Sequence, residues 1–316
     1  MNNQGNEELV VREHVVQTVC GSVPASELGF TLPHEHIMVD FGGAVTAGKH
    51  RYDADNVIEI MLPYLQAAAA QGVHTFFECT PNFLGRDPEI FRTLSERSGL
   101  NIVTNTGLYN NQYLPEYAKT QNAERLAEAW IAEFMDGIEG SGIKPGFIKT
   151  AVNPQPTALD LKLIHAAALA HKETGLTIAT HTCTADAAQA IVRILNQYQV
   201  DPSRWIFVHA HVEEDFSRVL ALAQTGIWIE LDGLAWGGDE DHVHKLMALL
   251  EHGYEDQILL SQDAGWYHIG EEAGGAVIPY TRLQAEFLPL LAARGVDSAM
   301  IDKITRLNPA NAFGLR

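Results

Sequence analysis

The chain has 316 residues, of which 46% are hydrophobic and 19% are charged, a composition typical of a soluble globular protein. Its formal net charge of -19 leaves no basic footprint for nucleic acid, so we exclude nucleic-acid binding. The first residues lack a basic segment followed by an apolar run, and no run of about eighteen apolar residues occurs, so we expect a cytoplasmic protein without membrane association. Three cysteines without a C-x-x-C pair predict no disulfide framework.

Short apolar segments that predict β-strands alternate with longer segments of helical character. The strands are expected at residues 30–39, 73–80, 101–109, 145–150, 176–182, 205–211, 226–232 and 257–263. Helices are expected at residues 56–72, 123–138, 158–175, 186–200 and 215–226, several of them ending near a glycine.

This alternation predicts the α/β class and, within it, a (β/α)8 TIM barrel. We expect a single domain over residues 1–316, because no linker rich in proline, glycine and serine divides the chain. A doubly wound open sheet is the alternative, but no glycine-rich phosphate loop follows the first strand.

The first predicted strand carries two histidines, His34 and His36, within "TLPHEHIMVD". Residues two apart in a strand point to the same face, so both imidazoles can reach one metal ion. A single His-x-His also occurs by chance, and buried histidines often only form hydrogen bonds with the backbone. The remaining strands must decide between these two interpretations.

Polar side chains recur at the ends of later strands, where the active site of a barrel lies. Lys149 ends the fourth strand, His181 the fifth, His209 the sixth and Asp263 the eighth. Each has an ordinary explanation alone, such as a cap or a hydrogen bond to a neighbouring carbonyl. Together with His34 and His36 they predict a metal site. Unpaired charged side chains are rarely tolerated at the strand ends of a barrel, and divalent cations would balance them.

Lys149 requires a separate explanation, because an ammonium group has no lone pair and repels a cation. A neutral lysine amine can add carbon dioxide and form a carbamate, whose two oxygens can bridge two metal ions. Imidazole and oxygen ligands favour zinc, and manganese, cobalt or iron are alternatives.

Several segments give the chain a wider resemblance. It resembles the phosphotriesterase-like branch of the amidohydrolase superfamily in residues 16–40 ("VQTVCGSVPASELGFTLPHEHIMVD"), "GRD" at 85–87, "AALAHKETGLTIATHT" at 167–182 and "LNPANAFGL" at 307–315. The resemblance covers nearly the whole chain. It implies a short N-terminal β-hairpin within an extension, residues 1–29, that packs on the barrel.

Carried over by position, the resemblance implies two divalent metal ions per chain. One would be bound by His34, His36 and Asp263 and the other by His181 and His209, while carboxylated Lys149 and a hydroxide bridge them. His211 lies two residues after His209 and is the alternative ligand on the sixth strand. Asp263 would also be the catalytic residue that accepts the proton of the hydroxide.

The resemblance implies a hydrolase, active as a homodimer, that acts on a small-molecule ester or lactone. We favour a lactone or another carboxylic ester, and an organophosphate triester is the alternative substrate. Two further alternatives are a mononuclear deaminase-type barrel and a non-catalytic metal-binding barrel. The first does not require a bridging Lys149, and the second does not require an open two-metal centre.

The loops after the strands select the substrate. Aromatic residues expected to line the pocket are Tyr109, Trp236, Trp266, Tyr267 and His268. No cluster of arginine and lysine that would hold a phosphate-bearing substrate is evident in these loops, although the sequence does not place Arg86 and Lys144.

Overall fold

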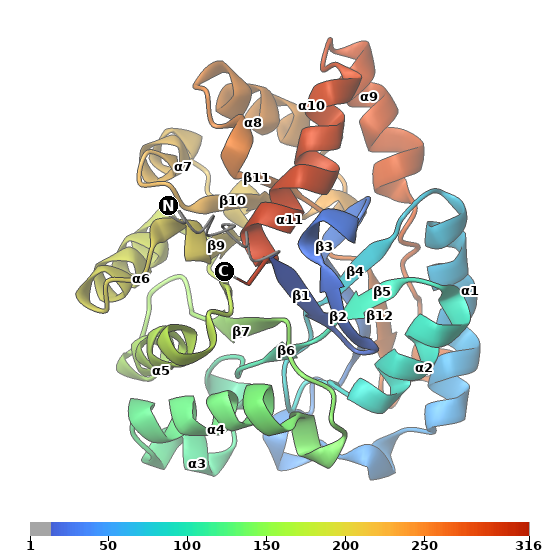
Figure 1. Cartoon of the computed structure of the whole chain (residues 1–316), viewed down its shortest axis with the longest axis vertical. Helices are drawn as coiled ribbons and strands as arrows, with labels where there is room; N and C mark the ends of the chain where they lie inside the picture. The colour runs from blue at the N-terminus through green and yellow to red at the C-terminus, as the bar shows by residue number, and fades with distance from the viewer. Residues whose placement is uncertain (1–13, 316) are drawn as a thin grey trace, which may run out of the picture.

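A computed structural model describes residues 14–315, with the strands gathered in a central barrel and the helices around it (Figure 1). The barrel strands are β3 (Thr31–Val39), β4 (Thr75–Glu78), β5 (Asn101–Val103) with β6 (Asn105–Thr106), β7 (Phe147–Ala151), β8 (Ile178–His181), β9 (Trp205–Val208), β10 (Trp228–Leu231) and β11 (Ile258–Leu260). They pair in parallel in two runs, β3-β4-β5 and β6-β7-β8-β9-β10-β11. This arrangement confirms the predicted α/β barrel.

The ring is completed at two places. Only Thr104 separates β5 from β6, so the two form successive parts of one barrel strand. On the other side, the main chain that follows β11 meets β3: the Asp263 N–H donates to the His34 carbonyl at 3.1 Å, and the His36 N–H donates to the Ala264 carbonyl at 2.9 Å. A further strand, β12 (Gly265–His268), then pairs with β3 in parallel.

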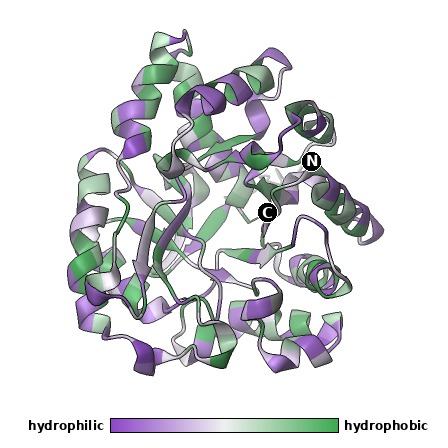
Figure 2. Ribbon diagram, turned by 180° about the vertical axis from the view of Figure 1, so that it is seen from behind, coloured by the Kyte–Doolittle hydropathy of each residue, from purple (hydrophilic) through white to green (hydrophobic). Residues whose placement is uncertain are grey.

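Helices pack around the barrel. The main ones are α1 (Ala54–Ala70), α2 (Pro88–Ser98), α4 (Ala123–Asp136), α5 (Ala158–Thr174), α6 (Ala185–Gln197), α7 (Phe216–Ala223) and α8 (Asp239–Glu251); shorter ones are α3 (Glu116–Thr120), α9 (Leu288–Ala293), α10 (Ser298–Asp302) and α11 (Asn308–Phe313). Hydrophilic and hydrophobic residues alternate along them (Figure 2), as expected of helices with one face against a sheet. No helix among the described residues is long and apolar enough to cross a membrane.

Helix α5 illustrates why these segments are helical. Thr157 and Asp160 form a reciprocal capping box at its start, and Gly175 ends it in the left-handed conformation with φ of 72°. The sequence predicts a helix over residues 158–175, and the structure agrees to within one residue.

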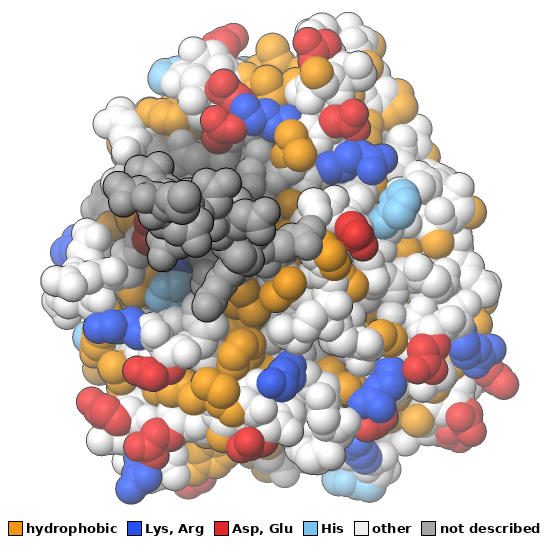
Figure 3. Space-filling model, in the orientation of Figure 1, with side chains coloured by type: hydrophobic (Ala, Val, Ile, Leu, Met, Phe, Trp, Pro, Cys, Tyr) orange, Lys and Arg blue, Asp and Glu red, His pale blue; other side chains and the backbone are white. Residues whose placement is uncertain are grey.

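An N-terminal hairpin and the C-terminal helix close the bottom of the barrel. Strands β1 (Val15–Thr18) and β2 (Gly21–Pro24) form the predicted antiparallel hairpin. The ring of Phe313, in α11, lies 4.0 Å from that of Phe77 in β4 and 5.7 Å from that of Phe147 in β7. In Figure 1 the hairpin and α11 lie in front of the strands, and Figure 3 shows acidic and basic side chains interspersed over this face outside its grey part. The carboxyl ends of the strands therefore open on the opposite face.

The strand ends differ from the prediction in ways that affect the site. Lys149 lies in the middle of β7, whereas the sequence predicts it at the strand end. His209 follows β9 directly and Asp263 lies three residues after the end of β11, and both adopt left-handed backbone conformations, with φ of 61° and 55°. The segment expected to be a loop after the last barrel strand contains β12, because its main chain continues the pairing along β3.

Candidate metal centre

His34 and His36 point into the barrel mouth from β3, while Glu35 between them points into the wall, as alternation along a strand requires. The Glu35 carboxylate accepts hydrogen bonds from the Ser261 hydroxyl at 2.8 Å and from the Ala264 N–H at 2.7 Å. Burial raises the pKa of Glu35 to about 8. Glu35 therefore fixes the main chain that follows β11 against the strand that carries both histidines.

The imidazole of His34 is oriented by two acidic residues on or directly after β10. Its Nδ1 lies 2.9 Å from Glu230 Oε2 and 2.9 Å from Asp232 Oδ2. With Nδ1 as the donor, Nε2 carries the lone pair, and it faces Lys149 Nζ at 3.4 Å and Asp263 Oδ1 at 3.8 Å. Burial, followed by the charge of Lys149, lowers the pKa of His34 to about 3, so the ring is neutral and able to bind a metal ion.

His36 and Asp263 approach each other on the same side of the mouth. His36 Nδ1 is 2.7 Å from Thr80 Oγ1, and its Nε2 is 3.1 Å from Asp263 Oδ1. That oxygen is buried and has no aligned hydrogen-bond partner among the described residues. Burial favours the neutral acid, but the contact with His36 outweighs it and holds the pKa of Asp263 below its usual value.

Ligand atoms of His34, His36 and Asp263 all lie within 4.8 Å of one another, and so do those of His34, His209 and Asp232. The first group fits a divalent cation, because it combines two imidazole nitrogens with a carboxylate oxygen that no donor satisfies.

Asp232 in the second group has a different role. Its Oδ1 lies 2.9 Å from His209 Nδ1, and its Oδ2 lies 2.9 Å from His34 Nδ1. Because its two oxygens accept from two imidazoles, Asp232 orients these rings from behind rather than binding a metal ion itself. The interaction with His209, with which it also forms a hydrogen bond, outweighs the effect of burial and keeps the pKa of Asp232 well below its usual range.

Lys149 reaches the centre from below. Its side chain is only 2% exposed, and no carboxylate among the described residues lies within ion-pair distance of its Nζ. A lysine side chain is rarely so deeply buried without a carboxylate partner, which makes Lys149 a candidate for covalent modification.

His181 and His209 meet on the other side of Lys149, with ring centroids 4.5 Å apart. His181 Nδ1 lies 3.1 Å from the Tyr109 hydroxyl, and its Nε2 lies 3.5 Å from Cys183 Sγ. Burial and then the neighbouring His209 lower the pKa of His181 well below its usual value, so this imidazole is also neutral.

His211, the alternative sixth-strand ligand, lies behind the centre. Its Nδ1 is 3.1 Å from Asp232 Oδ1 in an arrangement that is not aligned as a hydrogen bond. Its ring packs at 4.8 Å on His242 from α8, and it does not line the pocket over the centre. The structure thus brings His209, and not His211, to the mouth.

A small pocket of about 90 Å³ covers the centre. Besides the six predicted metal-centre residues it is lined by Val39, Phe41, Thr80, Pro81, Leu84, Tyr109 and Trp266. Trp236, Tyr267 and His268 are not among its lining residues. Tyr267 lies against α1, where its hydroxyl donates to Asn56 Oδ1 at 2.8 Å, and the ring of His268 lies at the rim, 5.7 Å from that of Phe41.

Sequence reasoning did not identify Thr80, Glu230, Asp232 or Phe41. A signal for two of them was present, because Glu230 and Asp232 are acidic residues in the otherwise apolar segment "GIWIELD". Thr80 and Phe41 belong to types common at any strand end, and the sequence offers no signal for them.

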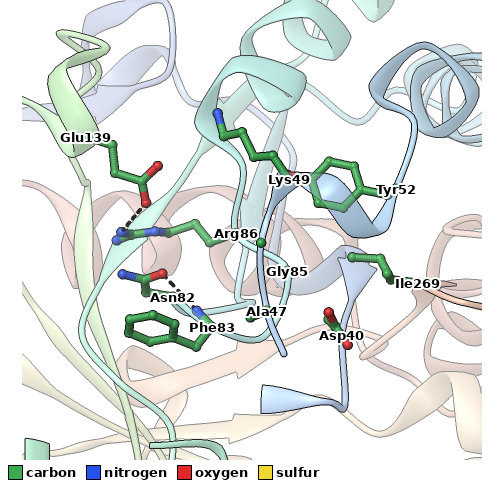
Figure 4. A pocket seen from close by; sticks show the side chains of 11 residues that line it. Asp40, Ala47, Lys49, Tyr52, Asn82, Phe83, Gly85, Arg86, Glu139 and Ile269 are labelled. Carbon is green, nitrogen blue, oxygen red and sulfur yellow. Dashed lines mark hydrogen bonds and ion pairs between the residues drawn. The ribbon is translucent and has the colours of Figure 1, made fainter. Parts of the chain in front are cut away.

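A second hollow, of about 170 Å³, lies beside the pocket and contains Arg86 (Figure 4). The Arg86 guanidinium is held by Glu133 through contacts of 2.7 and 2.8 Å and lies 3.8 Å from Glu139. Lys144 lies elsewhere, with its ammonium 5.6 Å from the ring centroid of Phe134. Neither cation reaches the pocket over the centre.

Neutral imidazoles, an unsatisfied carboxylate and a buried lysine at the carboxyl end of a (β/α)8 barrel are typical of metal-dependent hydrolases. Residues 14–313 match the Phosphotriesterase family, and the chain belongs to that family. It is a metal-dependent hydrolase, and its histidine-rich centre is consistent with the binuclear site of the family.

Known relatives are similar over nearly their whole length. The chain is 28% identical to the "Phosphotriesterase homology protein" of Escherichia coli over 290 residues, which cover 90% of this chain and 98% of that protein. It is 28% identical to the "Aryldialkylphosphatase" of Saccharolobus solfataricus (92% and 97% covered) and 25% identical to the "N-acetyltaurine hydrolase" of Xenopus tropicalis (93% and 96% covered). A triple mutant of the organophosphorus hydrolase from Deinococcus radiodurans is similar in structure, with a TM-score of 0.85, 30% identity and coverage of 96% and 98%.

Proposed function

We propose that this protein is a binuclear metal hydrolase that cleaves a lactone or another uncharged carboxylic ester. The observation that carries this proposal is the lining of the pocket. Around the centre it is apolar and aromatic, with Phe41, Leu84 and Trp266 among its walls, and Lys149 is the only lysine or arginine among its described lining residues. Such a pocket favours a neutral substrate with an apolar portion.

The proposed metal ligands follow the geometry. His34, His36 and Asp263 would hold one ion, His181 and His209 would hold the other, and Lys149 would contribute a ligand as a carbamate. Zinc is the proposed metal, since imidazole and carboxylate are its usual ligands. When bound, the metal would supply Lewis-acid chemistry and activate water as the nucleophile.

Residues around the centre accept the proton and position the substrate. Asp263 accepts a proton, since its carboxylate is held ionised and points into the mouth. Tyr109 presents a hydroxyl at the pocket wall, and burial raises its pKa, so it stays a neutral donor that can orient a substrate oxygen. Phe41 and Trp266, with ring centroids 6.0 Å apart and nearly parallel, provide an apolar wall.

The positions of the two unassigned cations support an uncharged substrate. A substrate with a sulfonate, such as the one named for the N-acetyltaurine hydrolase relative, needs a cation beside the pocket. Arg86 is bound by Glu133 in the neighbouring hollow, and Lys144 packs on Phe134.

An organophosphate triester is the second candidate, because it is uncharged and the named activity of the aryldialkylphosphatase relative points to it. A mononuclear deaminase does not account for Lys149. A non-catalytic barrel does not account for the unsatisfied Asp263 Oδ1.

The deciding experiment compares kcat/KM for γ- and δ-lactones with kcat/KM for an aryl dialkyl phosphotriester, on one preparation loaded with zinc in bicarbonate buffer. Metal content per chain is measured on the same preparation. A lactone preference of about a hundredfold, equivalent to about 2.7 kcal/mol of transition-state discrimination, supports the proposal. The opposite ratio assigns the pocket to phosphotriesters, and one ion per chain in the active enzyme contradicts the binuclear centre.

We also propose that the protein is a homodimer, as its resemblance to the family implies. Light scattering during size-exclusion chromatography tests this, and a mass of one chain across the working concentration range contradicts it.

A further inference from the structure

The main-chain carbonyl of Asp263 accepts hydrogen bonds from two tryptophan side chains. Trp266 Nε1 donates to it at 2.8 Å and Trp236 Nε1 at 3.1 Å. An indole N–H is a donor only, and a carbonyl oxygen has two lone pairs, so both acceptor positions of this oxygen are used. The two donors come from different segments: Trp236 from the loop after β10 and Trp266 from β12.

The backbone at this carbonyl is in a conformation that needs support. Asp263 has φ of 55°, which an aspartate tolerates better than most residues, and Trp266 has φ of 73°, which a bulky residue rarely adopts. Gly265 between them has φ of 97°, and a Cβ there would lie 1.8 Å from the His36 carbonyl oxygen. Strained residues of this kind persist only where their surroundings fix them.

The loop after β10 supplies part of that fixation. Its short 3-10 turn, η8 (Leu234–Trp236), donates to two successive carbonyls: the Ala235 N–H to Gln262 at 2.9 Å and the Trp236 indole to Asp263. The ring of Trp236 is 63% exposed and does not line the pocket. Its hydrogen bond, more than burial or a contact with substrate, therefore accounts for its position.

These hydrogen bonds also fix the orientation of the Asp263 N–H and carboxylate. Its N–H donates to the His34 carbonyl at 3.1 Å, and its Oδ1 lies 3.1 Å from His36 Nε2. With the N–H bound on one side and the carbonyl bound on the other, the peptide planes flanking Asp263 cannot rotate without breaking hydrogen bonds. The direction of the carboxylate is fixed with them.

We propose that Trp236 and Trp266 are positioning residues that hold Asp263 in its left-handed conformation, so that its carboxylate points at the metal centre. This inference rests on the role proposed above for Asp263. It reassigns Trp236 from contact with the substrate to orientation of the residue that accepts the proton.

The test replaces each indole by phenyl, which removes the N–H and keeps an aromatic ring. For Trp236→Phe and Trp266→Phe we expect kcat to fall about fivefold each, the loss of one ordinary hydrogen bond, and about thirtyfold together if the effects add. KM should not change in Trp236→Phe, because Trp236 does not line the pocket, whereas Trp266→Phe also alters the pocket wall and is judged by metal retention. Zinc-loaded variants should also lose metal to a chelator faster than the wild type, which a role in substrate binding does not predict.

Trp228→Phe is the matched control, since the Trp228 indole donates to the Ser203 carbonyl at 2.9 Å far from the centre. Its Tm should fall, while its kcat and its rate of metal loss should stay at wild-type values. Because Trp236 is largely exposed, Trp236→Phe should fold, and its Tm checks this.

Two results overturn the inference. One is wild-type kcat and metal retention in both phenylalanine variants. The other is a rise in KM for Trp236→Ala with no change for Trp236→Phe, which assigns the ring to the substrate. Metal retention is measured without a substrate, so a wrong substrate class leaves this test intact, whereas a phosphotriester preference overturns only the proposed function.

Discussion

Asp263 Oδ1 and His36 Nε2 lie 3.1 Å apart, yet this oxygen has no aligned hydrogen-bond partner among the described residues. Two lone pairs directed at one point indicate a cation between them rather than a shared proton. We therefore expect Asp263→Asn to retain the fold and most of the metal, because the amide oxygen can still bind, but to lose the proton acceptor. Turnover should fall by about a thousandfold or more.

The measurement for Asp263→Asn is kcat on the preferred substrate, together with metal content and Tm. Asp256→Asn is a suitable control, since Asp256 is an exposed partner of Lys303 far from the mouth. Wild-type kcat in Asp263→Asn would exclude the catalytic assignment.

Lys149 should carry a carbamate in the active enzyme. Lys149→Met removes the bridging group, so we expect fewer than two ions per chain and little activity, with partial recovery when a short-chain carboxylate such as propionate is added. Lys149→Glu keeps an anionic oxygen and should retain more metal than Lys149→Met. Metal analysis checks both variants, and Lys162→Met, at a side chain that donates to carbonyls of the α3 region, serves as the control.

Carbon dioxide provides an independent test of the same group. Metal-free protein reconstituted with zinc under gas free of carbon dioxide should stay less active than protein reconstituted in bicarbonate. Equal activity under both conditions would contradict a carbamate at Lys149.

Asp232 should affect both metal positions, because it accepts from His34, on one side of the centre, and from His209, on the other. Asp232→Asn cannot accept from both imidazoles, and we expect zinc affinity to fall by about ten- to a hundredfold at both positions. Thr80→Val removes only the partner of His36 and should weaken one position. Titration with a competing chelator measures zinc affinity at each position in both variants. If Asp232→Asn weakens zinc binding at one position only, as Thr80→Val does, Asp232 does not support both metal positions.

Much of the fold and of the centre follows from the sequence, because histidine, lysine and aspartate interrupt apolar strands at positions that a barrel brings to one mouth. Partners across strands do not follow, since the contact of His34 with Glu230 and Asp232 depends on how β3 and β10 face each other across the barrel. The assignment of Tyr267 to the pocket shows the same limit. In β12 it points away from Trp266, as alternation requires, and meets Asn56 of α1.

The metal-free protein should respond to acid through two neighbours that titrate with opposite effects. The pKa of His34 is lowered from 6.5 to about 3, so between these values the unfolded state binds a proton that the native state does not, and stability falls as the pH falls. The pKa of Glu35 is raised from 4.5 to about 8, so the native state binds the extra proton, and this contribution grows as the pH falls.

Urea unfolding of the metal-free protein at pH 6 and pH 5 separates the two contributions. Relative to the wild type, His34→Gln should lose less stability on acidification, and Glu35→Gln should lose more, each by about 1.2 kcal/mol over this unit of pH. The changes with pH are compared rather than the absolute stabilities, because both substitutions also remove native contacts. A greater loss than in the wild type for both variants would mean that His34 is protonated in the native state, and such an imidazole binds a metal ion only after it loses that proton. A smaller loss for both variants would mean that Glu35 is ionised in the native state.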